Sequence, residues 1–206
     1  MNKTVLALSG CLLVLVGCNE VKEKKNQTAT SLIEKATEVI SGTKFDALDI
    51  NRIEDNNAIV DITVGGENLQ DHFKKGFGNI TASKETIAIT ITGGENGQDN
   101  ILIGFTGKDL TIERPIKGKM VKGEIDGFTF SITKVTDNSM DVQLSFEAEG
   151  QIIFLQKDKV VIKVKGKMGS SADAENPDKW KPYEGNITLN YPIFQALGSS
   201  KEDFIY

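Results

Sequence analysis

The chain has 206 residues, enough for one domain of generous size or two small ones, and enough to bury a core without disulfide staples. Hydrophobic residues make up 39% and charged residues 26% of the sequence, a globular composition that excludes disorder over most of the chain. The 29 acidic residues against 24 Lys and Arg give a net charge of −5, which argues against nucleic-acid binding because phosphates would be repelled.

Residues 1–18 combine one positive charge, an apolar stretch and a small residue before a cysteine. The apolar stretch at 5–16 is shorter than the roughly 20 residues that a membrane-spanning helix needs, so it predicts a secretion signal. The four residues that end this segment are Leu15, Val16, Gly17 and Cys18. They resemble the lipobox of bacterial lipoproteins, and the chain therefore resembles a lipoprotein precursor over about a tenth of its length.

The lipoprotein resemblance implies a lipid anchor on Cys18. The sulfur would carry a diacylglycerol, the bond from Gly17 to Cys18 would be cut, and the new α-amino group would be acylated too. Two or more acyl chains make membrane attachment lasting, at about 0.8 kcal/mol per buried methylene, whereas one chain binds only marginally. In the sorting rule of this family Asp after the cysteine marks the inner membrane, so Asn19 implies the outer membrane of a Gram-negative envelope. An ordinary secretion signal with an incidental Cys18 is the alternative.

A polar run and a short amphipathic helix are predicted next. Residues 19–30 read NEVKEKKNQTAT, which has no core-forming pattern and predicts a tether. Ser31 and Glu34 have the spacing of a capping box, and Gly42 fits a helix end. Between them, apolar residues recur at helical spacing at Leu32, Ile33, Ala36, Val39 and Ile40. We expect a helix of about ten residues there, with an apolar face that needs the following sheet as its partner.

From residue 45 onward the apolar period changes from 3.6 to 2, the period of strands. Strands are predicted at 58–64, 86–92, 101–105, 110–114, 120–125, 128–135, 140–148, 151–156, 160–164 and 184–191. Asp126 and Gly127 predict a hairpin turn, and Glu149 and Gly150 predict another turn. Residues 166–185 lack a period and predict a long loop, functional or disordered, and residues 194–206 predict a tail able to pack.

The predicted fold is mostly β, an antiparallel sheet forming a sandwich or a barrel-like meander, with one short N-terminal amphipathic helix. We divide the chain into a signal peptide at 1–17, a lipidated cysteine with its tether at 18–30, and one β-rich domain at 31–206. A weak echo links VDITVGGENLQD at 60–71 with IAITITGGENGQD at 87–99. Shared turn chemistry and a duplicated β unit are both compatible with it, since two copies do not make a solenoid.

The mature chain offers little for catalysis. His72 is its single histidine and lies in a polar stretch, where we expect a solvated side chain. Zinc sites need about three or four His, Cys or acidic ligands, and no Gly-x-Ser-x-Gly elbow accompanies His72. The glycine-rich loop at 93–99 only superficially resembles calcium-binding turns of repeat-in-toxin proteins, because its spacing is off by one residue. We therefore predict a protein that is not an enzyme, with no catalytic residue, no metal and no cofactor.

Trp180 and Tyr183 are the candidate binding residues, because aromatic side chains among polar ones mark interfaces. The alternative is that Trp180 folds back to seal the end of the sheet.

Two functions are compatible with the sequence. The first is a membrane-anchored scaffold that binds an envelope protein or polymer through edge strands or the long loop. The second is a carrier, in which the inward residues Phe128, Phe130, Phe146 and Ile162 line a cavity for a lipid or another hydrophobic ligand. The sequence leaves the partner and the oligomeric state open.

Overall fold

The computed structural model describes residues 55–94, 97–122, 124–136 and 139–206. They belong to the second of two compact units, residues 49–206. The predicted signal peptide, Cys18, the tether and the helix that begins at Ser31 lie outside the described residues.

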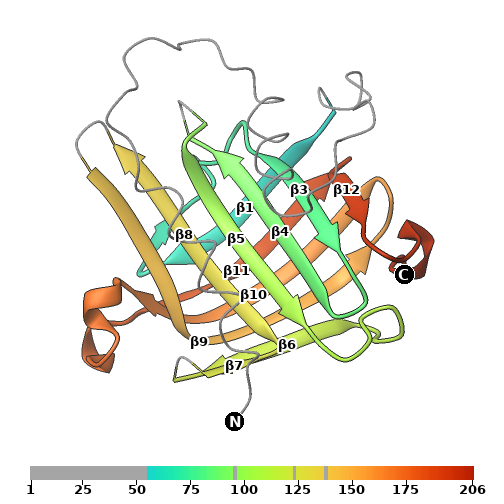
Figure 1. Cartoon of the computed structure of the whole chain (residues 1–206). Helices are drawn as coiled ribbons and strands as arrows, with labels where there is room; N and C mark the ends of the chain where they lie inside the picture. The colour runs from blue at the N-terminus through green and yellow to red at the C-terminus, as the bar shows by residue number, and fades with distance from the viewer. Residues whose placement is uncertain (1–54, 95–96, 123, 137–138) are drawn as a thin grey trace, which may run out of the picture. The chain divides into compact units, whose positions relative to one another are not determined.

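The described residues form one curled sheet of short and long strands (Figure 1). The strands are β1 Asn57–Val64, β2 Glu67–Asn68, β3 Phe77–Ala82, β4 Thr86–Gly93, β5 Asp99–Thr106, β6 Ile116–Val121, β7 Glu124–Asp126, β8 Phe128–Thr136, β9 Ser139–Leu155, β10 Lys159–Gly169, β11 Lys181–Asn190 and β12 Ile193–Ala196. Three single-turn 3-10 helices, η2 Ser171–Asp173, η3 Pro177–Lys179 and η4 Lys201–Asp203, complete this part of the chain. The prediction of a mostly β fold is confirmed.

The strand order is β12-β3-β4-β5-β8-β9-β10-β11-β1-β2, with β6 and β7 attached beside β9. All the pairs are antiparallel except β12 with β3. The long strand β9 pairs with β8 through its first part and with β6 through its second. It joins the two halves of the curl, which are β3, β4, β5 and β8 on one side and β10, β11 and β1 on the other. In Figure 1 the strands β3, β4, β5 and β8 lie side by side in front of β10 and β11.

Within the described residues, β1 near one edge of the sheet approaches β3 near the other edge at one place. The amide of Ala58 in β1 donates to the carbonyl of Gly76 just before β3, at 2.7 Å. The buried side chain of Asn56 continues this contact, because its amide donates to the Gly78 carbonyl and its oxygen accepts from the Gly78 amide. The sheet is therefore a half-barrel that closes at this point and not along the full length of its edges.

Alternating apolar side chains on the inward face fill the space between the two halves. Most of these Ile, Val and Phe side chains have no more than 3% of their surface exposed. Gly150 shows how tight the packing is, since a Cβ there would lie 2.0 Å from Cε2 of Phe128. A Cβ on Gly78 would likewise lie 2.8 Å from Cδ2 of Leu189. At these positions glycine is required because a side chain from the opposite half already occupies the space.

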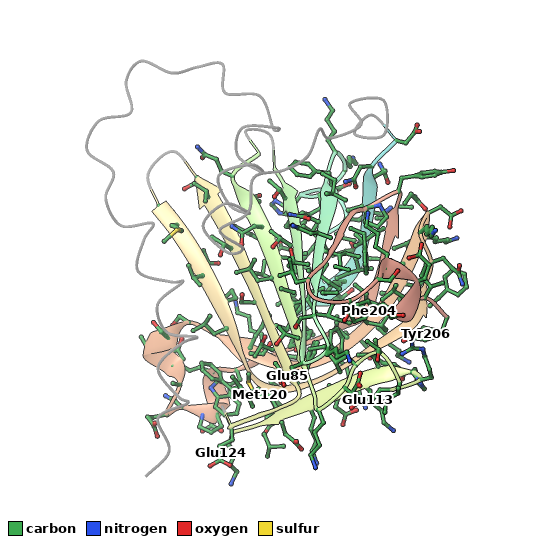
Figure 2. All side chains as sticks on the ribbon, turned by 45° about the vertical axis from the view of Figure 1, so that its right-hand side comes forward. Glu85, Glu113, Met120, Glu124, Phe204 and Tyr206 are labelled. Atoms are coloured by element: carbon green, nitrogen blue, oxygen red, sulfur yellow. The ribbon has the colours of Figure 1, made fainter. Side chains whose placement is uncertain are left out.

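The C-terminal tail packs as part of the domain. Phe204 has no exposed surface, and the backbone of Tyr206 exchanges two hydrogen bonds with Leu155 at the end of β9 (Figure 2). The guanidinium of Arg114 lies 4.6 Å from the centre of the Tyr206 ring. The tail therefore covers the end of the core next to β6 and β9, as the sequence indicated it could.

Several predicted boundaries are wrong. Residues 110–114 form turns instead of a strand, and they are held by hydrogen bonds from the Thr111 amide and hydroxyl to Asp109. Asp126 and Gly127 do not make a hairpin turn, because β7 pairs with β6 and not with β8. Gly150 lies inside a continuous β9, paired with Gly118 on one side and Val164 on the other.

The long loop predicted at 166–185 is also shorter than expected. The strand β10 runs to Gly169 and β11 begins at Lys181, so the connection is residues 170–180, and it contains η2 and η3. Three strands were missed entirely, the two-residue β2 and the longer β3 and β12.

Candidate interaction surface

The outward side of β3, β4, β5, β8 and the first part of β9 carries no charged residue in its three central rows. Strand registers place the side chains in rows across the sheet. The first row is Phe77, Thr92, Asn100, Thr133 and Val142. The middle row is Asn79, Thr90, Leu102, Ser131 and Leu144. The third is Thr81, Ala88, Gly104 and Thr129. We call these three rows the uncharged face.

Nine of the fourteen residues of the uncharged face are β-branched or small, and the other five are Phe77, Asn79, Asn100, Leu102 and Leu144. Threonine suits an outward strand position because its branched side chain favours extended backbone and its hydroxyl can meet water. The side chains are partly exposed, and Leu102 is the most exposed of them, at 41%. Leu102 is the third of five residues in the middle of three rows, so it lies at the centre of the face.

The outward side of the opposite half of the sheet is charged. The outward residues of β9 and β10 pair as ions, with Lys165 2.8 Å from Glu149 and Lys167 3.0 Å from Glu147. The hydrogen bond and charge of Glu149 raise the pKa of Lys165. Since about a quarter of the chain is charged, the absence of charge from the three rows sets the uncharged face apart from the rest of the outward surface.

A chain of polar contacts marks one end of the half-barrel. Lys134 in β8 lies 2.9 Å from Glu67 in β2, and Glu67 lies 3.2 Å from Nε2 of His72. Nδ1 of His72 lies 4.0 Å from the carboxylate of Asp99, which in turn accepts a hydrogen bond from the Val135 amide at 2.7 Å. The hydrogen bond from Lys134, and then its charge, lower the pKa of Glu67.

This chain of contacts offers no cluster of ligands. The two nitrogens of His72 face different carboxylates, and within residues 55–206, gaps aside, no group of three or more His, Cys, Asp or Glu side chains could hold a metal ion. The imidazole is 42% exposed, so the expectation of a solvated histidine agrees with its place, although the sequence did not indicate its two acidic neighbours.

The structure does not bring Trp180 and Tyr183 together into one patch. Tyr183 is 3% exposed, stacks on Phe130 with ring centroids 4.9 Å apart, and accepts a hydrogen bond from the Ser145 hydroxyl at 2.9 Å. Burial raises the pKa of Tyr183, and the Ser145 hydrogen bond opposes this shift. A residue so placed contributes to the core and offers almost no surface to a partner.

Trp180 packs outside the main core. Its ring stacks on Phe146 with centroids 4.9 Å apart, and its indole nitrogen donates to the Asp173 carbonyl at 2.8 Å. The contact agrees with the alternative in which this ring seals one end of the sheet. The ring keeps some exposed surface, so a binding role for Trp180 stays a prediction.

Three of the four residues considered for a carrier cavity lie in the main core. Phe128, Phe130 and Ile162 are almost fully buried, and the ring of Phe130 lies between those of Phe128 and Tyr183. Phe146 lies elsewhere, under Trp180 and outside the main core cluster.

Comparison with known proteins gives no assignment. No family model matches the chain, and neither the curated proteins nor the solved structures include a match. In the part of the chain that the structure describes, no helix is long and apolar enough to cross a membrane.

Sequence reasoning missed the uncharged face. The signal was present in strands such as TIAITITG, where Ala88, Thr90 and Thr92 alternate with buried isoleucines. Only the registers show that the neutral residues of five strands fall side by side.

Proposed function

We propose that this protein is a lipid-anchored lipoprotein of the bacterial cell envelope, in the outer membrane if the cell is Gram-negative. Its β-rich domain binds or scaffolds another envelope component and carries out no catalysis. The anchor is supported by the lipobox-like segment that ends in Cys18 and by the polar run after it. The binding surface is the uncharged face.

One observation favours a binding domain over a carrier, namely the packed interior. A carrier needs an apolar space of a few hundred Å³ that a ligand can enter. Here the ring of Phe128 lies against the backbone of Gly150, and Phe105, Phe130 and Tyr183 extend the same aromatic cluster. Because these side chains pack against one another inside the curl, we place recognition on the outer surface.

The anchor is tested with Cys18→Ser in the native cell. We expect this variant to leave the membrane fraction after salt and carbonate washes, because it has no site for the diacylglycerol. A Cys18→Ser protein that stays with the membranes would show that the lipoprotein assignment is wrong.

Binding is tested by capture from envelope extracts with the mature chain carrying Cys18→Ser. A matched pair of variants localises the surface: Leu102→Lys adds a charge at the centre of the uncharged face, and Ile59→Lys adds one on the outer side of β1. The two side chains are similarly exposed, at 41% and 44%. We expect Leu102→Lys to lose a partner that Ile59→Lys retains. Equal capture by both variants would contradict the placement of the binding surface.

The carrier alternative is tested by native mass spectrometry of the same soluble chain. The expected result is the mass of the polypeptide alone. A co-purified lipid would reverse the choice between the two functions.

A further inference from the structure

We infer that the uncharged face is a self-association surface, on which a second copy of this chain packs sheet against sheet about a two-fold axis close to Leu102. The inference rests on the proposed function, that the domain is a binding domain, and it names the partner. Charge, shape and area support it in turn.

The charge of the chain makes self-association selective for this face. With a net charge of −5, or 23 basic against 29 acidic residues once residues 1–17 are removed, two copies repel each other overall. In a two-fold interface the same patch meets itself, so residues of one charge near the axis face their own kind. The uncharged face contains no charged residue, so a two-fold axis through it brings no like charges together.

The charged residues lie around the uncharged face instead of on it. Lys84 and Glu85 form the turn between β3 and β4 at one end of the strands, where Glu85 is labelled in Figure 2. Lys134 and Asp99 lie on the inward side of β8 and β5, so they do not face a partner on the outward side. Charged residues are depleted at the centre of protein interfaces, as they are on the uncharged face.

The shape of the uncharged face allows close approach. Sheets that pack face to face lie about 10 Å apart, and the side chains of the two faces interdigitate in that space. Thr90 and Ser131 lie opposite Leu102 on the neighbouring strands, and Asn100 and Gly104 lie two residues away along β5. All four side chains are smaller than leucine, so Leu102 projects from its surroundings. A two-fold axis there brings the two Leu102 side chains together in the centre, where interface residues contribute most.

The area predicts a weak dimer. Five strands spaced about 4.8 Å apart, with three rows of about 6.7 Å, cover roughly 500 Å² on each copy. The total of about 1,000 Å² falls below the range of stable complexes, about 1,200–2,000 Å², and within that of weak ones. Lipid anchoring would favour such a dimer, because confinement to a membrane raises the local concentration of copies.

The test is analytical ultracentrifugation of the mature chain carrying Cys18→Ser, at concentrations up to about 1 mM. We expect a reversible monomer–dimer equilibrium. Leu102→Lys should raise the dissociation constant at least tenfold, because it places two ammonium groups next to each other at the axis, and Ile59→Lys should leave it unchanged. An equimolar mixture of Leu102→Lys and Leu102→Glu should restore the dimer, since opposite charges then meet at the axis.

Two results would overturn the inference. The first is a chain that remains monomeric throughout this concentration range. The second is a dimer that Ile59→Lys weakens as much as Leu102→Lys does, because its interface would then lie elsewhere. A monomer whose Leu102→Lys variant no longer sediments with insoluble envelope polymer, or no longer captures an envelope protein, would show that the face binds that component. In that case the self-association is wrong while the proposed binding function stands.

Discussion

Gly150→Ala tests whether the interior is packed. The added methyl carbon would lie 2.0 Å from Cε2 and 2.4 Å from Cζ of Phe128, far inside van der Waals contact. Phe128 cannot easily move, because it is fully buried and its ring lies 5.1 Å from that of Phe105 and 6.5 Å from that of Phe130. Overpacking of a tight core costs about 1–3 kcal/mol.

The expected loss can be converted into a melting temperature. A contact this short takes the upper end of that range, about 3 kcal/mol, and replacing glycine by alanine recovers about 0.4–1 kcal/mol through the unfolded state, so a net loss of about 2 kcal/mol is expected. For a domain of this size that loss corresponds to a melting temperature lower by about 4–8 °C. Urea unfolding and a thermal melt of the Cys18→Ser chain measure it.

Gly169→Ala is the matched control. It also lies in a strand, but its added Cβ would meet its nearest neighbour, a Phe146 ring carbon, at an ordinary 3.5 Å. We expect stability within about 0.5 kcal/mol of the wild type. In a Phe128→Leu background Gly150→Ala should lose most of its cost, because the ring atoms that it would contact are gone. A Gly150→Ala protein as stable as the wild type would refute the reasoning and leave space for a ligand beside Phe128.

Three further predictions concern the polar and aromatic side chains. Trp180→Ala should cost about 2 kcal/mol in a urea melt by removing the stack on Phe146 and the hydrogen bond to Asp173, and unchanged stability with weaker capture of a partner would instead support a binding role. The pKa of Tyr183 is raised on folding, so the stability of its neutral phenol is fully present below about pH 10 and is lost as the pH rises through the folded pKa. Tyr183→Phe should therefore flatten the alkaline fall of stability while costing about 1 kcal/mol at pH 7, and an unchanged alkaline slope would contradict the assignment. His72→Ala should change stability at pH 7 by less than about 0.5 kcal/mol and leave binding intact, because its contacts are exposed, and a loss of binding without loss of fold would assign His72 a role in recognition.

The strands that the sequence predicted well are those with one solvent-facing side and one buried side. The segments β1, β4 and β11 alternate cleanly, with Val60, Ile89 and Ile187 among the inward residues. Alternation of this kind depends only on the local period of the strand, so a single sequence is sufficient to show it.

The wrong predictions of turns and strands arise where pairing or packing with other strands determines the local structure. Gly150 indicates a turn locally, yet the structure uses it as space for Phe128 from the opposite half. The Asp126 and Gly127 pair signals a hairpin, but β7 pairs with the preceding β6 and not with the following β8. In β3 the sequence FGNITA places Gly78 and Asn79 in a strand that tertiary contacts stabilise. For Gly150 and Gly78 the deciding partners, Phe128 and Leu189, are distant in sequence, so local propensity could not have predicted the outcome.

The uncharged face depends on one irregularity that the sequence does not reveal. Around Phe146 the register of β9 against β10 shifts by a residue, as in a β-bulge. A shift by one residue exchanges the two faces of a strand. Uninterrupted alternation predicts that Phe146 points inward with Ala148, whereas the structure stacks it on Trp180.

The same shift lets β9 serve both halves of the domain. After Phe146 the odd-numbered residues face outward, so Glu147 and Glu149 pair with lysines of β10. Before it the even-numbered residues face outward, so Val142 and Leu144 align with Thr133 and Ser131 of β8. Without the shift, an unbroken period would put Gln143 and Asp141 outward beside the serine and threonines of β8, and a carboxylate would border the uncharged face. The bulge therefore keeps the charges of β9 on one half of the sheet and completes the neutral rows on the other.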